Sequence, residues 1–97
     1  MPSSKEYLDF VLEQLSQLED IRYRYMMGEY IIYYKDIIVG GIYDDRFLIK
    51  NIPGAKKMMP NAQIEIPYKG AKGMLLVDNI DNKEFLKELI EKMYEEL

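Results

Sequence analysis

Few side chains in this sequence could carry out covalent chemistry. It contains no histidine, cysteine or threonine, and its only serines are Ser3, Ser4 and Ser16. Without histidine or cysteine, no Ser-His or Cys-His nucleophile–base pair can form, and a zinc site would need carboxylates alone. We therefore expect no catalytic residue, no metal ion and no cofactor, and we identify no small-molecule substrate.

Carboxylates remain as possible acids and bases, because a pair of Asp or Glu side chains suffices in glycosidases. The candidates are Glu29, Asp44 and Asp45. Asp44 and Asp45 are explained more simply as turn residues, because aspartate tolerates positive φ. We rank a carboxylate-based enzyme last of three functional hypotheses and predict a non-enzymatic protein.

The segment from Tyr68 to Gly73, YKGAKG, resembles a phosphate-binding loop only superficially. It lacks the spaced Gly-Lys-Ser/Thr pattern, and no strand-then-helix context surrounds it. We expect an ordered loop beside a sheet rather than a phosphate site.

Length and composition predict one domain over residues 1–97, of which 48% are hydrophobic. The lack of cysteine, of a long apolar run and of a signal-peptide pattern favours a cytoplasmic protein with no membrane partner. The formal charge of −4 is unevenly distributed. Residues 1–20 hold one lysine and five acids, residues 21–80 nine Lys/Arg and six acids, and residues 81–97 three lysines and six acids. The central region is therefore basic and both ends are acidic.

The run from Met26 to Lys50 is rich in aromatic and β-branched residues and predicts consecutive strands. We interpret Lys35-Asp36 and Asp44-Asp45 as two-residue hairpin loops. That register defines a core face and an opposite, open face. The predicted core face carries Ile31, Tyr33, Ile38, Gly40, Ile42, Phe47 and Ile49. The predicted open face carries Tyr30, Ile32, Tyr34, Ile37, Val39, Gly41, Tyr43, Arg46, Leu48 and Lys50.

Residues 21–26 alternate tyrosine with arginine and predict a further strand. A two-residue loop would set Arg24 beside Ile31, which the register above assigns to the core. Because burying unpaired charge costs several kcal/mol, we predict a three-residue loop, Met27 to Glu29, with Gly28 at positive φ.

Apolar spacing predicts a first helix from Ser3 to about Leu18, a short helix near residues 55–59, a strand at residues 74–77 and a final helix capped by Asp81 and Glu84. The expected fold is a two-layer α+β domain of order α-β-β-β-β-α-β-α. It has an antiparallel sheet of about five strands, with both terminal helices on one face.

A set of strings distributed along the chain resembles the N-terminal domain of the TfoX/Sxy family of competence regulators. The strings are MMGEY at 26–30, GGIYDD at 40–45 and PY at 67–68, joined by Tyr34, Lys50, Gly70, Ala71, Lys72 and Met74. Family-motif positions are Met27, Gly28, Glu29, Tyr30, Gly40, Gly41, Tyr43, Asp44, Tyr68, Gly70, Ala71 and Lys72.

This resemblance implies a two-layer domain without known enzymatic activity. It also implies a part in transcription regulation of DNA-uptake genes, in concert with a DNA-binding activator. Family regulators usually carry a C-terminal domain, for which no residues follow Leu97, so we expect a standalone N-terminal-type domain. The glycines and tyrosines of these strings also suit a structural role, in turns and in packing.

The leading functional hypothesis is protein–protein contact through the open sheet face, with a homodimer as the simplest partner. Its composition, tyrosine- and arginine-rich with few acids, is typical of interfaces. The expected interface residues are Arg22, Arg24, Tyr30, Ile32, Tyr34, Val39, Tyr43, Arg46 and Leu48. The alternative is a nucleic-acid module that binds single strands through interleaved basic and aromatic residues.

Overall fold

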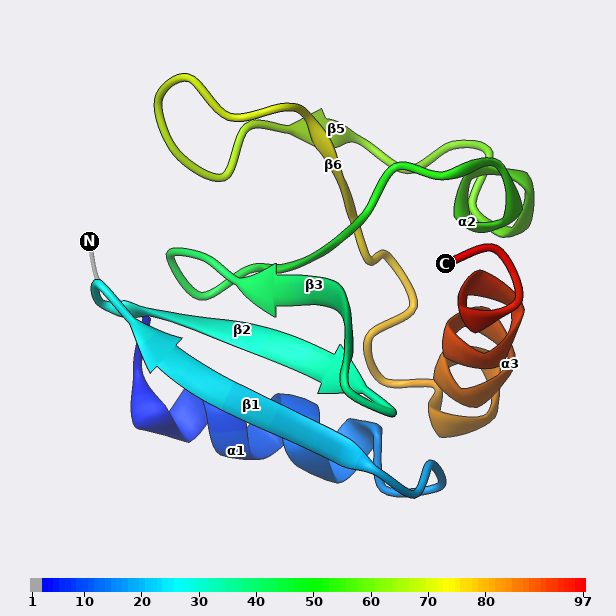
Figure 1. Ribbon diagram of the computed structural model, residues 1–97, viewed down its shortest axis with the longest axis horizontal. Helices are drawn as coiled ribbons and strands as arrows, with labels where there is room; N and C mark the ends of the chain where they lie inside the picture. The colour runs from blue at the N-terminus through cyan, green and yellow to red at the C-terminus, as the bar shows by residue number, and fades with distance from the viewer. Residues whose placement is uncertain (1–2) are drawn as a thin grey trace.

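The computed structural model describes residues 3–97 and contains nine elements, shown in Figure 1. They are α1 (Lys5–Gln14), β1 (Ile21–Met26), β2 (Glu29–Tyr34), β3 (Ile37–Ile42), β4 (Phe47–Ile49), α2 (Pro53–Met58), β5 (Ile64–Glu65), β6 (Met74–Leu76) and α3 (Lys83–Tyr94).

The strands form one antiparallel sheet in the order β1-β2-β3-β4-β6-β5. The predicted α+β architecture is confirmed, with helices α1 and α3 on one face. The sheet has six strands rather than about five, because the two-residue strand β5 also forms, between the predicted short helix and the predicted strand at residues 74–77. Its short length explains why hydrophobic periodicity did not indicate it.

Helix α1 begins at Lys5, two residues after the predicted start at Ser3, and ends at Gln14, before the predicted end near Leu18. The hydroxyl of Ser4, not Ser3, caps it by accepting from the Tyr7 N–H at 3.1 Å. The α-helix stops at Gln14, and single turns continue the chain, so that Leu15 and Leu18 remain buried. Asp20 then takes a positive φ of 63° where the chain reverses into β1.

Helix α3 is capped by Asn82 rather than Asp81: the Asn82 side chain accepts from the Phe85 N–H at 3.0 Å. Its apolar stripe is buried together with that of α1. The shared core cluster includes Leu8 and Val11 of α1 and Leu86, Leu89, Ile90 and Met93 of α3.

The three hairpin loops that connect β1 to β4 have two residues each. The predicted loops at Lys35-Asp36 and Asp44-Asp45 are confirmed, and both residues of each have positive φ, between 51° and 65°. This backbone conformation matches the right-handed twist of the flanking strands. The three-residue loop predicted after β1 is wrong, because Met26 pairs with Glu29 and only Met27 and Gly28 form the turn.

The arginines nevertheless face away from the core, as expected. Arg24 pairs with Ile31, and Ile31 points outward, so the two-residue loop buries no charge. A longer loop was predicted only because Ile31 was assigned to the core face, and that assignment is wrong. Gly28 does take a positive φ, of 85°.

A register shift between β2 and β3 explains that incorrect face. Tyr33 pairs with Ile38, but Ile32 pairs with Gly40, so Val39 is an extra residue in β3. Successive side chains of a strand point to opposite faces of the sheet. One extra residue therefore moves every side chain beyond it to the face opposite to the one predicted. The core positions predicted at Ile42, Phe47 and Ile49 are confirmed, whereas Ile31, Tyr33 and Ile38 point outward.

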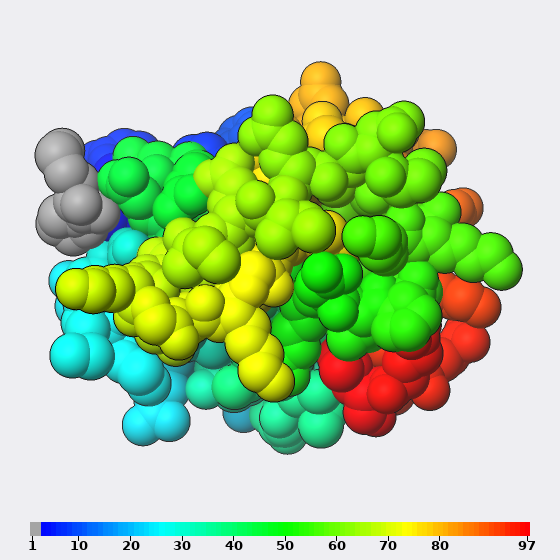
Figure 2. Space-filling view, turned by 90° about the horizontal axis from the view of Figure 1, so that it is seen from above, coloured from blue at the N-terminus to red at the C-terminus, as the bar shows by residue number. Residues whose placement is uncertain are grey.

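The two faces of the sheet are covered by different parts of the chain. Helices α1 and α3 pack on the inner face, and the segment between β5 and β6 lies on the other side (Figure 1). Seen from above, that yellow segment lies in front of the cyan strands, and blue helix α1 is mostly hidden (Figure 2). Among residues 3–97, no helix is long and apolar enough to cross a membrane.

Candidate interaction surface

Four residues of the predicted interface lie in the core instead. Tyr30, Ile32, Tyr34 and Val39 are all buried in the cluster that contacts α1 and α3. Ile32, for example, is 0% exposed. The bulge at Val39 is the physical reason, since it places alternate residues of β2 on the inner face with Ile42 and Phe47.

Three other predicted interface residues face outward but are not free surface. Tyr43 and Leu48 are buried although neither belongs to the core cluster. Arg46 forms an ion pair with Glu65, and its Nε–H donates to the Tyr43 carbonyl at 3.0 Å. These residues form a second, smaller covered region on the outer face.

The cover of this region is the segment of residues 66–73. Its Tyr68 ring lies 6.3 Å from the Tyr43 ring, at an interplanar angle of 49°. Burial raises the pKa of Tyr43 above its ordinary value, with smaller contributions from Tyr68 and Glu29. The loop predicted to lie beside the sheet therefore lies against its outer face.

The outward side chains of β1–β3 that this loop leaves uncovered form what we call the open strip. Its members are Arg22, Arg24, Ile31, Tyr33 and Ile38. Arg22 lies 3.7 Å from Asp36, a pair that is largely exposed and so contributes little to stability. The predicted outward positions of Arg22 and Arg24 agree with the structure.

Sequence reasoning missed Ile31, Tyr33 and Ile38 as surface residues, although Ile38 is 40% exposed. One signal could have found them. Adjacent glycines at 40 and 41 inside an otherwise apolar strand are typical of a bulge or a close backbone approach. A bulge at that point predicts the observed faces.

Strand β1 is an edge of the sheet and is paired only with β2. Every residue after Ile21 is exposed, and Tyr25 is 61% exposed although it lies on the helix side. An edge strand of this length presents unpaired N–H and C=O groups to any chain that can add to it. The edge and the open strip adjoin, because Arg22 and Arg24 belong to both.

The carboxylate of Glu29 ties three segments together. It accepts from the Ser3 hydroxyl at 2.8 Å, from the Ser3 N–H at 3.1 Å and from the Asp44 N–H at 3.2 Å. The Asp45 carboxylate accepts from the Ser4 N–H at 2.8 Å. Glu29 and Asp45 thus act as hydrogen-bond acceptors that fix the N-terminal segment to two hairpin turns. Within residues 3–97, no cluster of three or more acidic side chains could hold a metal ion.

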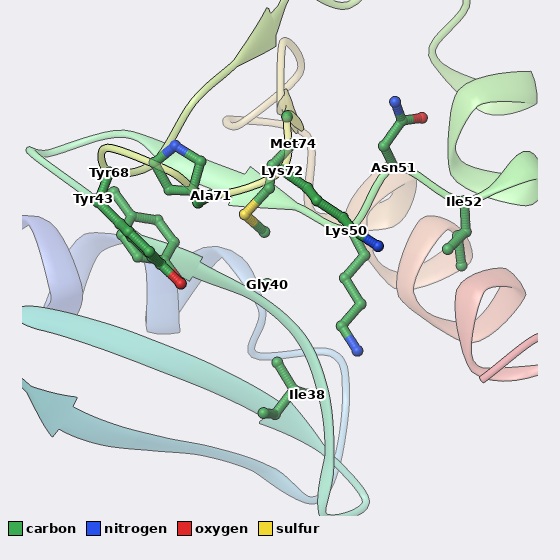
Figure 3. A pocket seen from close by; sticks show the side chains of 12 residues that line it. Ile38, Gly40, Tyr43, Lys50, Asn51, Ile52, Tyr68, Ala71, Lys72 and Met74 are labelled. Atoms are coloured by element: carbon green, nitrogen blue, oxygen red, sulfur yellow. The ribbon is translucent and has the colours of Figure 1, made fainter.

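Seven of the twelve positions named for the sequence resemblance line two hollows beside the Tyr43–Tyr68 pair: Met27, Glu29, Gly40, Tyr43, Tyr68, Ala71 and Lys72. One hollow, of about 470 Å³, is lined by Met26, Met27, Glu29, Ile31, Tyr43 and Tyr68. The other, of about 540 Å³, includes Gly40, Ala71 and Lys72 in its lining and is shown in Figure 3. Gly70 takes a positive φ of 88° in the loop that separates Tyr68 from Lys72.

Comparison with known proteins gives one relative and no fold neighbour. The chain is 31% identical over 80 residues to the "Uncharacterized 12.7 kDa protein in trpE 5'region" of Spirochaeta aurantia. The match covers 82% of this chain and 70% of that protein. No family model matches the chain, and no solved structure matches it either.

Proposed function

The chain belongs to the same family as the uncharacterized Spirochaeta aurantia protein, and from its own residues we propose that it is a non-enzymatic module for protein–protein contact. Its partner adds an extended segment to the free edge of β1. The observation that carries this proposal is that β1 has six residues, five of them exposed, and a strand on only one side.

The charge of the edge favours an acidic partner. Arg22 and Arg24 alternate with Tyr23 and Tyr25, so a partner strand would set one side chain opposite an arginine at every second position. Opposite charges across such a pair are stabilising. We infer a segment in which acidic residues alternate with apolar ones.

The sequence favours a homodimer through the open sheet face; a homodimer through the β1 edge instead meets a physical obstacle. In a two-fold antiparallel pairing centred on Tyr23, Arg22 of one copy lies opposite Arg24 of the other. In a pairing centred on Arg24, that residue lies opposite itself. Like charges directly opposite each other are destabilising, so both registers are disfavoured.

The direct test is titration with a synthetic peptide of alternating Glu and Val, followed by backbone NMR shifts. We expect chemical-shift changes in the backbone amides of residues 21–26 and of the neighbouring residues of the open strip. Arg22→Glu with Arg24→Glu should weaken binding by about tenfold or more and should switch preference to an alternating Lys and Val peptide. Lys56→Glu with Lys57→Glu on α2 is the charge-matched control.

The proposal is wrong if the peptide leaves β1 unperturbed, or if the control pair weakens binding as much as the arginine pair does. Sedimentation addresses the homodimer separately. A concentration-dependent dimer that Arg22→Gln with Arg24→Gln strengthens, by removing the like-charge repulsion, would show that a second copy is the occupant.

Single-stranded nucleic acid is the second candidate, because Arg22, Arg24 and Tyr33 share the outer face with Lys50 and Lys72. The acidic net charge of −4 weighs against it. An oligothymidylate of about 20 nucleotides retained at about 50 mM salt and released at higher salt would favour this function over peptide binding.

The resemblance to the TfoX/Sxy N-terminal domain suggests the cellular process in which this protein–protein contact takes part. Under that resemblance the protein acts in the cytoplasm in transcription regulation, and the partner segment belongs to a DNA-binding activator. A pull-down with the arginine double variant as the negative control tests whether such an activator is captured through β1.

A further inference from the structure

The larger hollow on the outer face is built from three separate segments. Ile38 and Gly40 come from β3, Lys50 to Ile52 follow β4, and residues 67–74 come from the covering loop and β6. Its volume of about 540 Å³ falls within the range of small-molecule sites. We call it the Lys50–Lys72 hollow.

The charge of this hollow is uncompensated. Lys50 and Lys72 both line it, and no acidic residue does. Within residues 3–97 neither lysine forms an ion pair, whereas the lysines of α1 and α3 do. Those pairs are Lys5–Asp9, Lys83–Glu13, Lys87–Glu91 and Lys92–Glu95. The hollow thus concentrates positive charge in a protein that is acidic overall.

The rest of the lining is apolar or aromatic. The Tyr43 and Tyr68 rings lie together at one end, and Lys50, Lys72 and Asn51 lie toward the other (Figure 3). Ile38, Ile52, Pro67, Ala71 and Met74 complete the walls. A ligand that fits must combine an apolar body with a negative charge, and tyrosine edges and faces favour a ring as that body.

Side chains, not backbone, supply the anion contacts. The Ala71 N–H is engaged with the Tyr68 carbonyl at 3.0 Å, and the Lys50 N–H with the Val39 carbonyl at 3.0 Å. These two N–H groups are therefore not available to an anion in the hollow. The two ammonium groups are the side-chain donors on which the anion contact depends.

We propose that the Lys50–Lys72 hollow binds a small aromatic anion. Its ring lies against Tyr43 and Tyr68, and its carboxylate or sulfonate lies between Lys50 and Lys72. This site is distinct from the β1 edge, so its failure in a test would leave peptide addition at β1 unaffected.

The probe is 8-anilinonaphthalene-1-sulfonate, which carries a ring system and one sulfonate and whose fluorescence rises in an apolar site. We expect saturable binding to the native protein and displacement by 1-naphthoate, an aromatic carboxylate. Lys50→Gln with Lys72→Gln should weaken binding by about tenfold or more, because two charge-assisted contacts are lost. Lys56→Gln with Lys57→Gln removes the same charge from α2 and should leave binding unchanged.

A second variant, Ala71→Phe, fills the hollow without changing charge and should also abolish binding, while thermal unfolding confirms that it folds. The proposal is overturned if the native protein does not bind the probe, or if 1-naphthoate fails to displace it. Equal loss in the two lysine pairs would also overturn it, since that result would reflect net charge alone.

Discussion

The two faces of the sheet achieve burial by different means. The inner face is covered by α1 and α3, whose apolar stripes fill one continuous core with Tyr30, Ile32, Ile42 and Phe47. The outer face has no helix. A single loop, residues 66–73, covers the β3–β4 side of it through the Tyr43–Tyr68 contact and leaves the open strip uncovered.

A sheet face covered by helices and one covered by a loop differ in how much of their surface stays accessible to solvent. Amphipathic helices remove a whole sheet face from water and account for most of the hydrophobic stabilisation. A loop covers less area and leaves hollows at its margins, here on either side of the Tyr43–Tyr68 pair. The inner face therefore stabilises the fold, and both proposals concern the other face and its β1 edge.

The largest expected effect separates two neighbouring isoleucines of β2. Ile32→Ala on the inner face should lower the free energy of unfolding by about 3–4 kcal/mol, because it leaves a cavity in the core. Ile31→Ala on the open strip should cost less than about 1 kcal/mol. Urea unfolding of both variants measures the difference, and equal losses would contradict the face assignment and the bulge at Val39.

An intermediate loss of stability is expected when alanine replaces Gly40 or Gly70. A methyl group at Gly40 would overlap the Leu48 carbonyl oxygen and crowd the Ile49 Cα, both backbone atoms of β4 that cannot move aside. Gly40→Ala should therefore lower stability by about 2 kcal/mol. Gly70→Ala, in open space at a positive φ of 88°, should cost about 1 kcal/mol from backbone strain alone. If Gly40→Ala is the milder of the two in thermal unfolding, the close β3–β4 approach is wrong.

The smallest effect is a pH dependence that both faces share. Burial raises the pKa of Tyr43 on the outer face and of Tyr7 on α1. Each phenol therefore ionises more readily in the unfolded chain, whose tyrosines titrate near pH 10. Below that pH both buried phenols contribute to the free energy of unfolding. This contribution is lost as the pH rises further. Tyr43→Phe should flatten this alkaline loss without a large change at neutral pH. An unchanged slope, measured by urea unfolding across the alkaline range, would show that residues 66–73 do not shield Tyr43.

Much of the fold could be predicted from local patterns. The Asp-containing two-residue turns, the terminal amphipathic helices and the α+β class follow from turn chemistry and periodicity that act over a few residues. The candidate site was predicted only in part. Arg22 and Arg24 were placed correctly, whereas four predicted interface residues are core, because Tyr30 to Tyr34 are apolar at every position and no alternation selects a face.

Local residue types are enough to indicate the strands, two of the turns between them and the lack of histidine and cysteine chemistry. The face of β2 that meets the helices depends on the folded chain, because one extra residue at Val39 reverses the register and is set by the packing of distant segments. The folded chain also brings Lys50, Lys72, Tyr43 and Tyr68 around one hollow, since a loop's path over a sheet is set by contacts that no local pattern encodes.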